Sequence, residues 1–224
     1  MNKKGFIFDL DGVIVDTAKY HYLAWKKLAN SIGIDFSEDQ NEQLKGISRT
    51  RSLERILEWG NKTLNDDEFM ELMAKKNSDY LNYINKMDES EILPDVTKIL
   101  DYLLEQNQPT ALGSASKNAR AILKRVNLIQ QFDAIVDGND VSKAKPNPEV
   151  FLNAANGLKV QPEYCIVFED SVAGILAANN ANMISIGIGK ESILNEADYV
   201  FNDFTEISIE FLDELINVEK KVIK

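Results

Sequence analysis

Short apolar runs alternate with amphipathic helical segments through the second half of the chain. The runs at 109–116, 133–136, 164–170 and 183–189 have the length and composition of buried strands. The segments between them place apolar residues at helical spacing, over 117–128, 147–158 and 171–182. Strands and helices in alternation predict a parallel sheet covered by helices on both faces. The apolar run at 5–10 is expected to join the same sheet.

The region from about residue 16 to residue 90 has helical periodicity throughout and no convincing strand. Its first helix would present one apolar face, formed by Ala18, His21, Trp25, Leu28 and Ile32. We therefore predict a doubly wound α/β core made of residues 1–15 and 93–224. A helical cap, residues 16–92, would be inserted after the first strand, and the segment 88–95 would lead back into the core.

Polar side chains follow several of the predicted strands, at the edge of an open parallel sheet where ligands bind. They are Asp9, Asp11, Ser114, Ser116, Lys145, Glu169 and Asp170. Four carboxylates at one edge repel each other unless a cation neutralises them, and oxygen ligands of this kind suit Mg²⁺. The helix expected to start near Lys117 would add free backbone N–H groups, which bind anions.

This set of groups indicates phosphoryl transfer, a reaction in which positioning and charge neutralisation supply most of the catalysis. A metal ion, a lysine, a hydroxyl and backbone donors would surround a carboxylate. That carboxylate can itself attack phosphorus and form an aspartyl phosphate. Asp9 and Asp11 would then be paired because one carboxylate attacks while the other transfers protons.

The composition narrows the choice of partners and of compartment. A net charge of −11 argues against nucleic acid, although a small phosphorylated substrate needs only a few local cations. The chain has no apolar run long enough to span a membrane and no signal-peptide pattern at its start. Its single cysteine, Cys165, lies in a core-strand pattern, so we expect no disulfide and a cytoplasmic location.

Four stretches of the chain resemble, in order, the motifs of the haloacid dehalogenase superfamily. They are "DLDGVIVDT", "GSAS", "KAKPNPEVF" with Lys145, and "FEDSVAGI". The resemblance implies that Asp9 is the nucleophile and Asp11 the general acid and base. It also implies that Ser114 and Lys145 hold the transferring phosphate. Mg²⁺ would be bound by Asp9, the backbone carbonyl of Asp11 and Asp170, with Glu169 beside them.

The predicted cap and one core loop resemble those of the β-phosphoglucomutase family within this superfamily. The matching stretches are "HYLAWKKLA", "LKGISRTRS", "KKN" and "SASKN". The resemblance implies interconversion of β-D-glucose 1-phosphate and β-D-glucose 6-phosphate through phospho-Asp9 and β-glucose 1,6-bisphosphate, with Mg²⁺ as cofactor. It implies small sugar phosphates as the partners, with no nucleic acid and no membrane, and we expect a monomer because the cap must move freely.

The same resemblance assigns further residues to the substrate. Arg49 would bind the distal phosphate together with the loop of Ala115, Ser116, Lys117 and Asn118. His21 would couple closure of the cap to Asp11, and Thr17 would lie at the hinge between core and cap. The remaining cap residues expected at the cleft are Lys45, Gly46, Ser52 and Lys76.

Alternative interpretations remain open at this point. The chain could be a Mg²⁺-dependent sugar-phosphate phosphatase on the same scaffold, or a binding protein on an inactive one. Arg49 could be a solvated residue that opens a helix, and Gly46 could simply end one. A single histidine on an apolar face, such as His21, is more often a core residue than a ligand contact.

Overall fold

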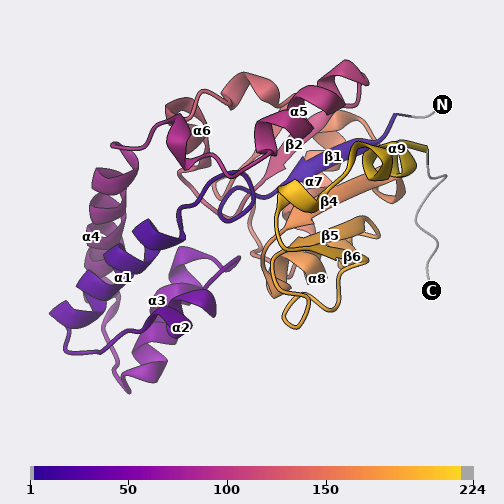
Figure 1. Ribbon diagram of the computed structural model, residues 1–224. Coiled ribbons are helices and arrows are strands. Elements are labelled where there is room, and N and C mark those ends of the chain that lie inside the picture. Colours follow the sequence, from indigo (N-terminus) through magenta and orange to yellow (C-terminus); the bar gives the residue numbers. More distant parts are fainter. Residues whose placement is uncertain (1–2, 218–224) are drawn as a thin grey trace.

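The computed structural model describes residues 3–217 and contains a parallel sheet with a group of helices at one end (Figure 1). Within these residues the sheet has six strands in the order β3-β2-β1-β4-β5-β6. The strands are β1 (Gly5–Phe8), β2 (Thr110–Gly113), β3 (Ala134–Val136), β4 (Cys165–Glu169), β5 (Ile184–Ile188) and β6 (Tyr199–Phe201). The predicted parallel sheet is confirmed, and β6 is an edge strand that the sequence analysis did not identify.

Successive side chains of the strands face opposite sides of the sheet, and each side has its own apolar core. Phe6 and Phe8 belong to one core, in which they pack with α5 (Val96–Glu105), α6 (Ala119–Arg125) and α9 (Ile209–Asn217). Ile7 belongs to the other, which α7 (Glu149–Leu158) and α8 (Val172–Asn180) cover. The prediction of helices on both faces is therefore confirmed. Four short 3₁₀ turns complete the described elements: η1 (Glu89–Glu91), η2 (Ile129–Gln131), η3 (Pro162–Tyr164) and η4 (Phe204–Glu206).

The inserted cap consists of four helices with a separate apolar core. They are α1 (Ala18–Ser31), α2 (Glu38–Glu42), α3 (Arg49–Trp59) and α4 (Asp66–Ile84). The cap core contains Trp25, Leu28, Phe36, Leu53 and Ile56. Side-chain caps at the first turns of α2, α3 and α4 fix where these helices begin.

Two chain segments connect the cap to the core, and they lie side by side. Val15 forms an antiparallel bridge with Ile92, and the Leu93 amide donates to the Ile14 carbonyl oxygen at 3.0 Å. The exact division at residues 15/16 and 92/93 stays a prediction. None of the helices in the described part of the chain has the length and apolar character that a membrane span requires.

The strand order places a topological switch point between β1 and β4. The chain leaves β1 for β2 and β3 on one side, then returns to β4, β5 and β6 on the other. Ligands of open α/β sheets bind in the crevice at the carboxyl ends of such neighbouring strands. Asp9 directly follows β1, and Glu169 ends β4, so the sequence places both carboxylates at this crevice. The cap follows β1 and lies at this edge of the sheet (Figure 1).

Candidate active site

Lys145 lies between two carboxylates at the switch point. Its Nζ is 2.6 Å from Asp9 Oδ1 and 2.8 Å from Glu169 Oε2, and it also donates to the Gly113 carbonyl oxygen at 3.2 Å. Burial alone would lower the pKa of Lys145, but Asp9 and Glu169 together raise it above its ordinary value. Lys145 is therefore a fixed cation in the floor of the site. The peptide bond between Lys145 and Pro146 is cis.

Three carboxylates form a compact group beside this lysine. One oxygen each from Asp9, Glu169 and Asp170 can be chosen so that all three lie within 4.8 Å of one another. Burial and the neighbouring Glu169 raise the pKa of Asp9, and the same two causes raise the pKa of Asp170 to about 7. Within the described residues, the buried Oδ2 of Asp170 receives no hydrogen bond, although Lys45 Nζ lies 3.2 Å away. An oxygen-only group with an unsatisfied carboxylate oxygen fits a hard divalent cation.

The side chain of Asp11 lies outside this group of three, although it lines the same cavity as Asp9. The Asp11 amide donates to Asp9 Oδ2 at 3.0 Å, but its carboxylate accepts a hydrogen bond from Thr17 Oγ1. His21 Nε2 lies 3.8 Å from Asp11 Oδ1. Burial raises the pKa of Asp11, which favours a carboxyl group that can give and take protons.

His21 is joined to a buried lysine on its other side. Lys76 Nζ is 3.1 Å from His21 Nδ1 and lies over the rings of Trp25 and Tyr80, 4.5 Å and 4.6 Å from the ring centres. Burial and the charges of Lys76 and Arg49 lower the pKa of His21, so its ring is neutral. Because Nδ1 accepts the ammonium proton, the ring carries its own proton on Nε2, which faces Asp11. His21 is thus part of the site rather than an apolar core residue.

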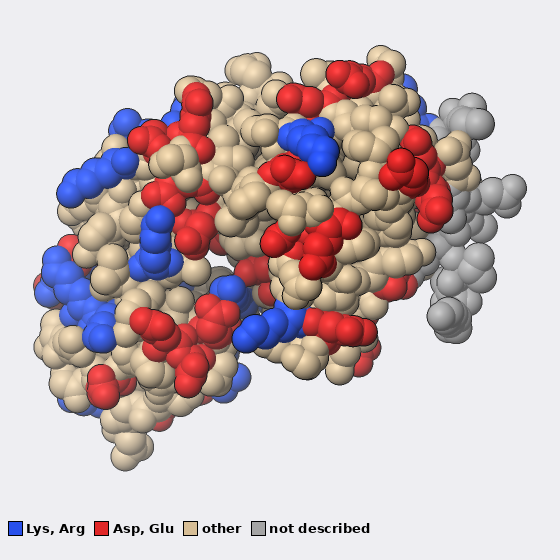
Figure 2. Space-filling model, viewed as in Figure 1, with Lys and Arg blue, Asp and Glu red and all other residues tan. Residues whose placement is uncertain are grey.

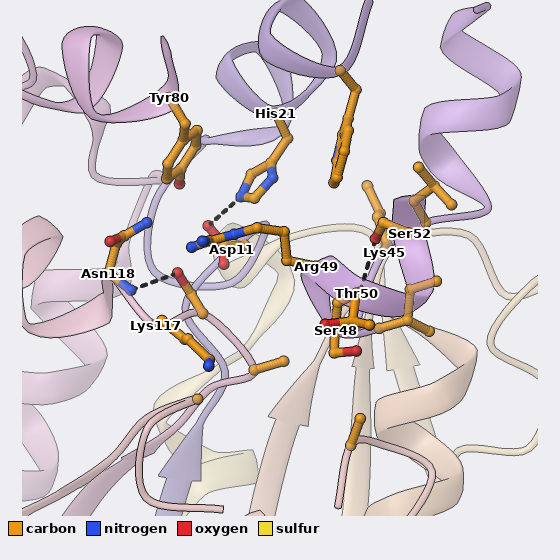
Figure 3. A pocket seen from close by; sticks show the side chains of 18 of the residues that line it. Asp11, His21, Lys45, Ser48, Arg49, Thr50, Ser52, Tyr80, Lys117 and Asn118 are labelled. Carbon is orange, nitrogen blue, oxygen red and sulfur yellow. Dashed lines mark hydrogen bonds and ion pairs between the residues drawn. The ribbon is translucent and has the colours of Figure 1, made fainter. Parts of the chain in front are cut away.

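A cavity of about 370 Å³ lies between the cap and the core, and Figure 2 shows a hollow between the two parts. Asp9 and Asp11 contribute to its lining from the core, and Figure 3 shows Asp11 there. The other predicted substrate residues that line it are His21, Lys45, Gly46, Arg49, Ser52, Lys76, Ala115, Ser116, Lys117 and Asn118. Thr17, Ser114 and Lys145 are buried next to this lining. The structure therefore brings the predicted residues of both domains to one enclosed space.

Arg49 begins α3 and extends its half-buried side chain into this cavity (Figure 3). Burial lowers the pKa of its guanidinium, and no carboxylate of residues 3–217 lies within ion-pair distance of it. Arg51 and Arg55 on the same helix, in contrast, pair with glutamates at the surface. A partly desolvated guanidinium without an acidic partner is suited to an anionic ligand, and planar, bidentate binding favours phosphate.

The loop 114–118 is organised by its own hydroxyl groups. Ser114 Oγ accepts from the Ser116 amide at 3.1 Å, and Ser116 Oγ accepts from the Asn118 amide at 3.3 Å. Because each hydroxyl acts here as an acceptor, its own O–H remains available as a donor. The Asn118 side chain donates to Asn77 Oδ1 in the cap at 3.1 Å, a contact between the domains that the sequence analysis did not anticipate.

Gly46 marks a point where the cap touches the core. Its φ is +73°, and a Cβ at this position would lie 2.2 Å from Ser171 Oγ. The residue therefore permits close approach of the two domains, in addition to a turn that other residues rarely adopt. Gly12 permits a similarly close approach within the core, because a Cβ at this position would lie 2.2 Å from Asp170 Oδ2.

Tyr80 also lines the cavity but was absent from the sequence prediction. It lies four residues after Lys76 on α4, and residues with this spacing share one face of a helix. That spacing was the available signal, since a tyrosine in a polar helical stretch carries no chemical pattern of its own. The sequence prediction also omitted Ser171, whose hydroxyl donates to Glu169 Oε1 at 2.5 Å.

Comparison with known proteins agrees with this geometry. Residues 3–182 match the haloacid dehalogenase-like hydrolase family, and the chain belongs to that family. Its similar proteins include β-phosphoglucomutases. The β-phosphoglucomutase of Bacillus subtilis is 44% identical over 94% of both chains. The crystal structure of β-phosphoglucomutase from Clostridium difficile superposes with a TM-score of 0.92 at 43% identity, covering 96% of this chain and 98% of that one.

Phosphatases are also among the similar proteins, at lower identity. The fructose-1-phosphate phosphatase of Escherichia coli is 31% identical over 82% of this chain and 95% of its own. The predicted membership of the β-phosphoglucomutases is thus confirmed, and the fold is one that phosphatases share.

Lys76 provides a prediction that depends on pH. Burial and Arg49 lower its pKa to about 7, whereas an unfolded chain leaves the lysine near its ordinary value. The unfolded state therefore binds more protons between about pH 7 and pH 10, and the stability of the wild type gains from a rise in pH over this range. We expect Lys76→Met to be more stable than the wild type at pH 6.5. The difference should narrow by at most about 1.4 kcal/mol for each pH unit above 7.

Urea unfolding at several pH values measures this difference. The matched control is Lys75→Met, because Lys75 is the exposed neighbour on the same helix. A stability difference between Lys76→Met and the wild type that stays constant from pH 6.5 to pH 9.5 would contradict the assignment.

Proposed function

We propose that the protein is an active β-phosphoglucomutase, which interconverts β-D-glucose 1-phosphate and β-D-glucose 6-phosphate. The observation that carries the proposal is the enclosed cavity, whose walls combine the Asp9–Lys145 pair with the unpartnered guanidinium of Arg49. A phosphatase needs one phosphate site, whereas a mutase must hold a sugar bisphosphate and needs two. The identity of 44% with a β-phosphoglucomutase supports the same choice.

In one half-reaction, Asp9 Oδ attacks a phosphorus atom of β-glucose 1,6-bisphosphate, which forms an aspartyl phosphate and releases a glucose monophosphate. Lys145 and Ser114 hold the transferring phosphate, and Asp11 gives a proton to the leaving sugar oxygen. Mg²⁺, held by Asp9, Asp170 and the Asp11 carbonyl with Glu169 beside them, would neutralise the negative charge of the carboxylates and the phosphate. In the other half-reaction, Asp11 removes a proton from a hydroxyl of the incoming glucose monophosphate, which takes the phosphoryl group from phospho-Asp9; β-glucose 1,6-bisphosphate and free Asp9 are formed.

The distal phosphate binds Arg49 and the loop of Ser116, Lys117 and Asn118. Lys45, Gly46, Ser52 and Lys76 form the cap wall against the sugar, with Ala115 in the core loop. The bisphosphate must turn over between the half-reactions, so that each of its phosphates reaches Asp9 in turn. The substrate is thus a small sugar phosphate, and this mechanism requires no macromolecular partner.

A mutase must also favour a sugar hydroxyl over water as the acceptor. His21 belongs to the cap and Asp11 to the core, so their contact forms only when the domains are close together. The binding energy of the sugar phosphate closes the cap and aligns Asp11. A water molecule offers too little binding energy to close the cap. Thr17, which bonds Asp11 where the chain enters the cap, lies at the hinge of this movement.

The test is an assay of both products in one tube. We expect protein incubated with Mg²⁺, β-glucose 1-phosphate and a trace of β-glucose 1,6-bisphosphate to release glucose 6-phosphate with negligible free phosphate. Free phosphate with little glucose 6-phosphate would instead identify a phosphatase that shares the core chemistry. Asp9→Asn, which lacks the nucleophile, is the control for both products.

Replacement of His21 tests the coupling between the cap and the acid–base group. In His21→Ala, transfer to the sugar should fall by about 10²-fold, the scale of one general acid–base contribution, while hydrolysis of phospho-Asp9 continues. The ratio of glucose 6-phosphate to free phosphate should therefore drop at least tenfold. Asn30→Ala, at an exposed position of α1, should leave the ratio unchanged. An unchanged ratio in His21→Ala would remove His21 from the mechanism.

A further inference from the structure

Tyr80 carries a hydroxyl group that has no hydrogen-bond partner among the described residues. Its side chain is among the largest fully buried ones, with 1% of the residue exposed. Within residues 3–217, its hydroxyl is buried and makes no hydrogen bond. A buried hydroxyl without a partner costs about 1–3 kcal/mol, and phenylalanine would fill the same space without that cost. The hydroxyl therefore points to an acceptor that comes from outside the chain.

The direction of this hydroxyl is fixed by the groups around the ring. The centre of the His21 ring lies 4.3 Å from that of the Tyr80 ring. Lys76 Nζ lies over the Tyr80 ring, 4.6 Å from its centre. Figure 3 shows the side chain descending from α4 into the cavity, with its hydroxyl at the lower end, toward the core residues Asp11 and Asn118. A ring held in this way has little freedom to turn its hydroxyl elsewhere.

The hydroxyl is available as a hydrogen-bond donor. Burial and the charge of Asp11 raise the pKa of Tyr80 well above its usual range, so the phenol stays protonated. Thr17 and Arg49 act on the pKa of Tyr80 in the opposite direction. The Thr17 hydroxyl donates to Asp11, and among the described residues no hydrogen bond joins it to the Tyr80 hydroxyl.

The surroundings distinguish between parts of a sugar phosphate. The phosphates have charged partners in Lys145 and Arg49, and a neutral phenol is a weak addition to either. Tyr80 lines the same cavity as Asp11 and Arg49, the groups assigned to the two ends of the ligand. The part of the ligand that lies between two phosphates is the sugar ring with its hydroxyl groups.

We propose that the Tyr80 hydroxyl donates a hydrogen bond to one ring hydroxyl oxygen of the bound sugar phosphate. Tyr80 is then a specificity-determining residue, since it recognises the orientation of that hydroxyl. This inference rests on the proposed function insofar as it takes the ligand to be a sugar phosphate. It does not depend on whether sugar or water accepts the phosphoryl group.

The experiment pairs Tyr80→Phe with substrates that lack one ring hydroxyl each: the 2-, 3- and 4-deoxy analogues of β-glucose 1-phosphate. In the wild type, we expect one analogue to lose about tenfold or more in kcat/KM. Tyr80→Phe should lose a similar factor with the parent substrate and no further factor with that analogue, since both changes remove the same bond. The two other analogues should lose equal factors in both proteins.

Three further measurements separate recognition from structure. Tyr83→Phe, on the same helix but outside the cavity lining, should behave as the wild type. Formation of phospho-Asp9 from acetyl phosphate, which has no sugar, should proceed in Tyr80→Phe at the wild-type rate. Without ligand, Tyr80→Phe should be at least as stable as the wild type, because it removes an unsatisfied hydroxyl.

Three results would each overturn the proposal. The first is that Tyr80→Phe lowers kcat/KM by the same factor for all three analogues. The second is that Tyr80→Phe leaves kcat/KM with the parent substrate unchanged, and the third is a clear loss of its stability without ligand. If the wild type releases free phosphate instead of glucose 6-phosphate, the mutase assignment fails. The analogue series then gives the same test through phosphate release, so the two failures can be told apart.

Discussion

The structure is organised around the burial of several like charges at one point of a parallel sheet. The pairing of Phe8 with Phe168 puts β1 beside β4, and the residues that follow each of them, Asp9 and Glu169, meet across this pair. Two buried carboxylates are strongly unfavourable without a cation, and Lys145 contacts both. Asp170 adds a third carboxylate, and its Oδ2 lies 3.2 Å from Lys45 Nζ without a hydrogen bond, so the group favours a further cation. The chemistry of the site thus follows from the strand order and from charge neutralisation together.

The cap supplies the part of the site that a phosphoryl-transfer core alone does not need. It encloses the cavity, brings His21 to Asp11, and adds the cations Arg49 and Lys76 without carboxylate partners in the described chain. Such groups reduce stability, because desolvated charges are costly, and we attribute their presence to the ligand rather than to folding. The contacts of Asn77 with Asn118 and of Gly46 with Ser171 place the two domains at the short distance this arrangement requires.

Much of this arrangement could be predicted from the chain because its signals are local. Apolar runs separated by helical periodicity predicted five strands and both helical layers, and the polar residues after the strands marked the edge that binds ligands. The three-residue strand β6 carries too short an apolar run for this reasoning, and it is defined by its pairing with β5. The hydrogen bond between Thr17 and the Asp11 carboxylate could not be predicted, because it forms only in three dimensions. The role of Tyr80 could not be predicted either, because it follows from the missing hydrogen-bond partner of its hydroxyl and not from its residue type.

The central claim is that phospho-Asp9 is protected from water and yields its phosphoryl group to a sugar phosphate. The most direct test is to label the enzyme with ³²P acetyl phosphate, remove the excess, and chase it with β-glucose 1-phosphate or with buffer alone. We expect the label to pass into sugar phosphates in the first chase, and to leave the enzyme as free phosphate at least about 10²-fold more slowly in the second. Loss of the label as free phosphate at the same rate in both chases would contradict the account.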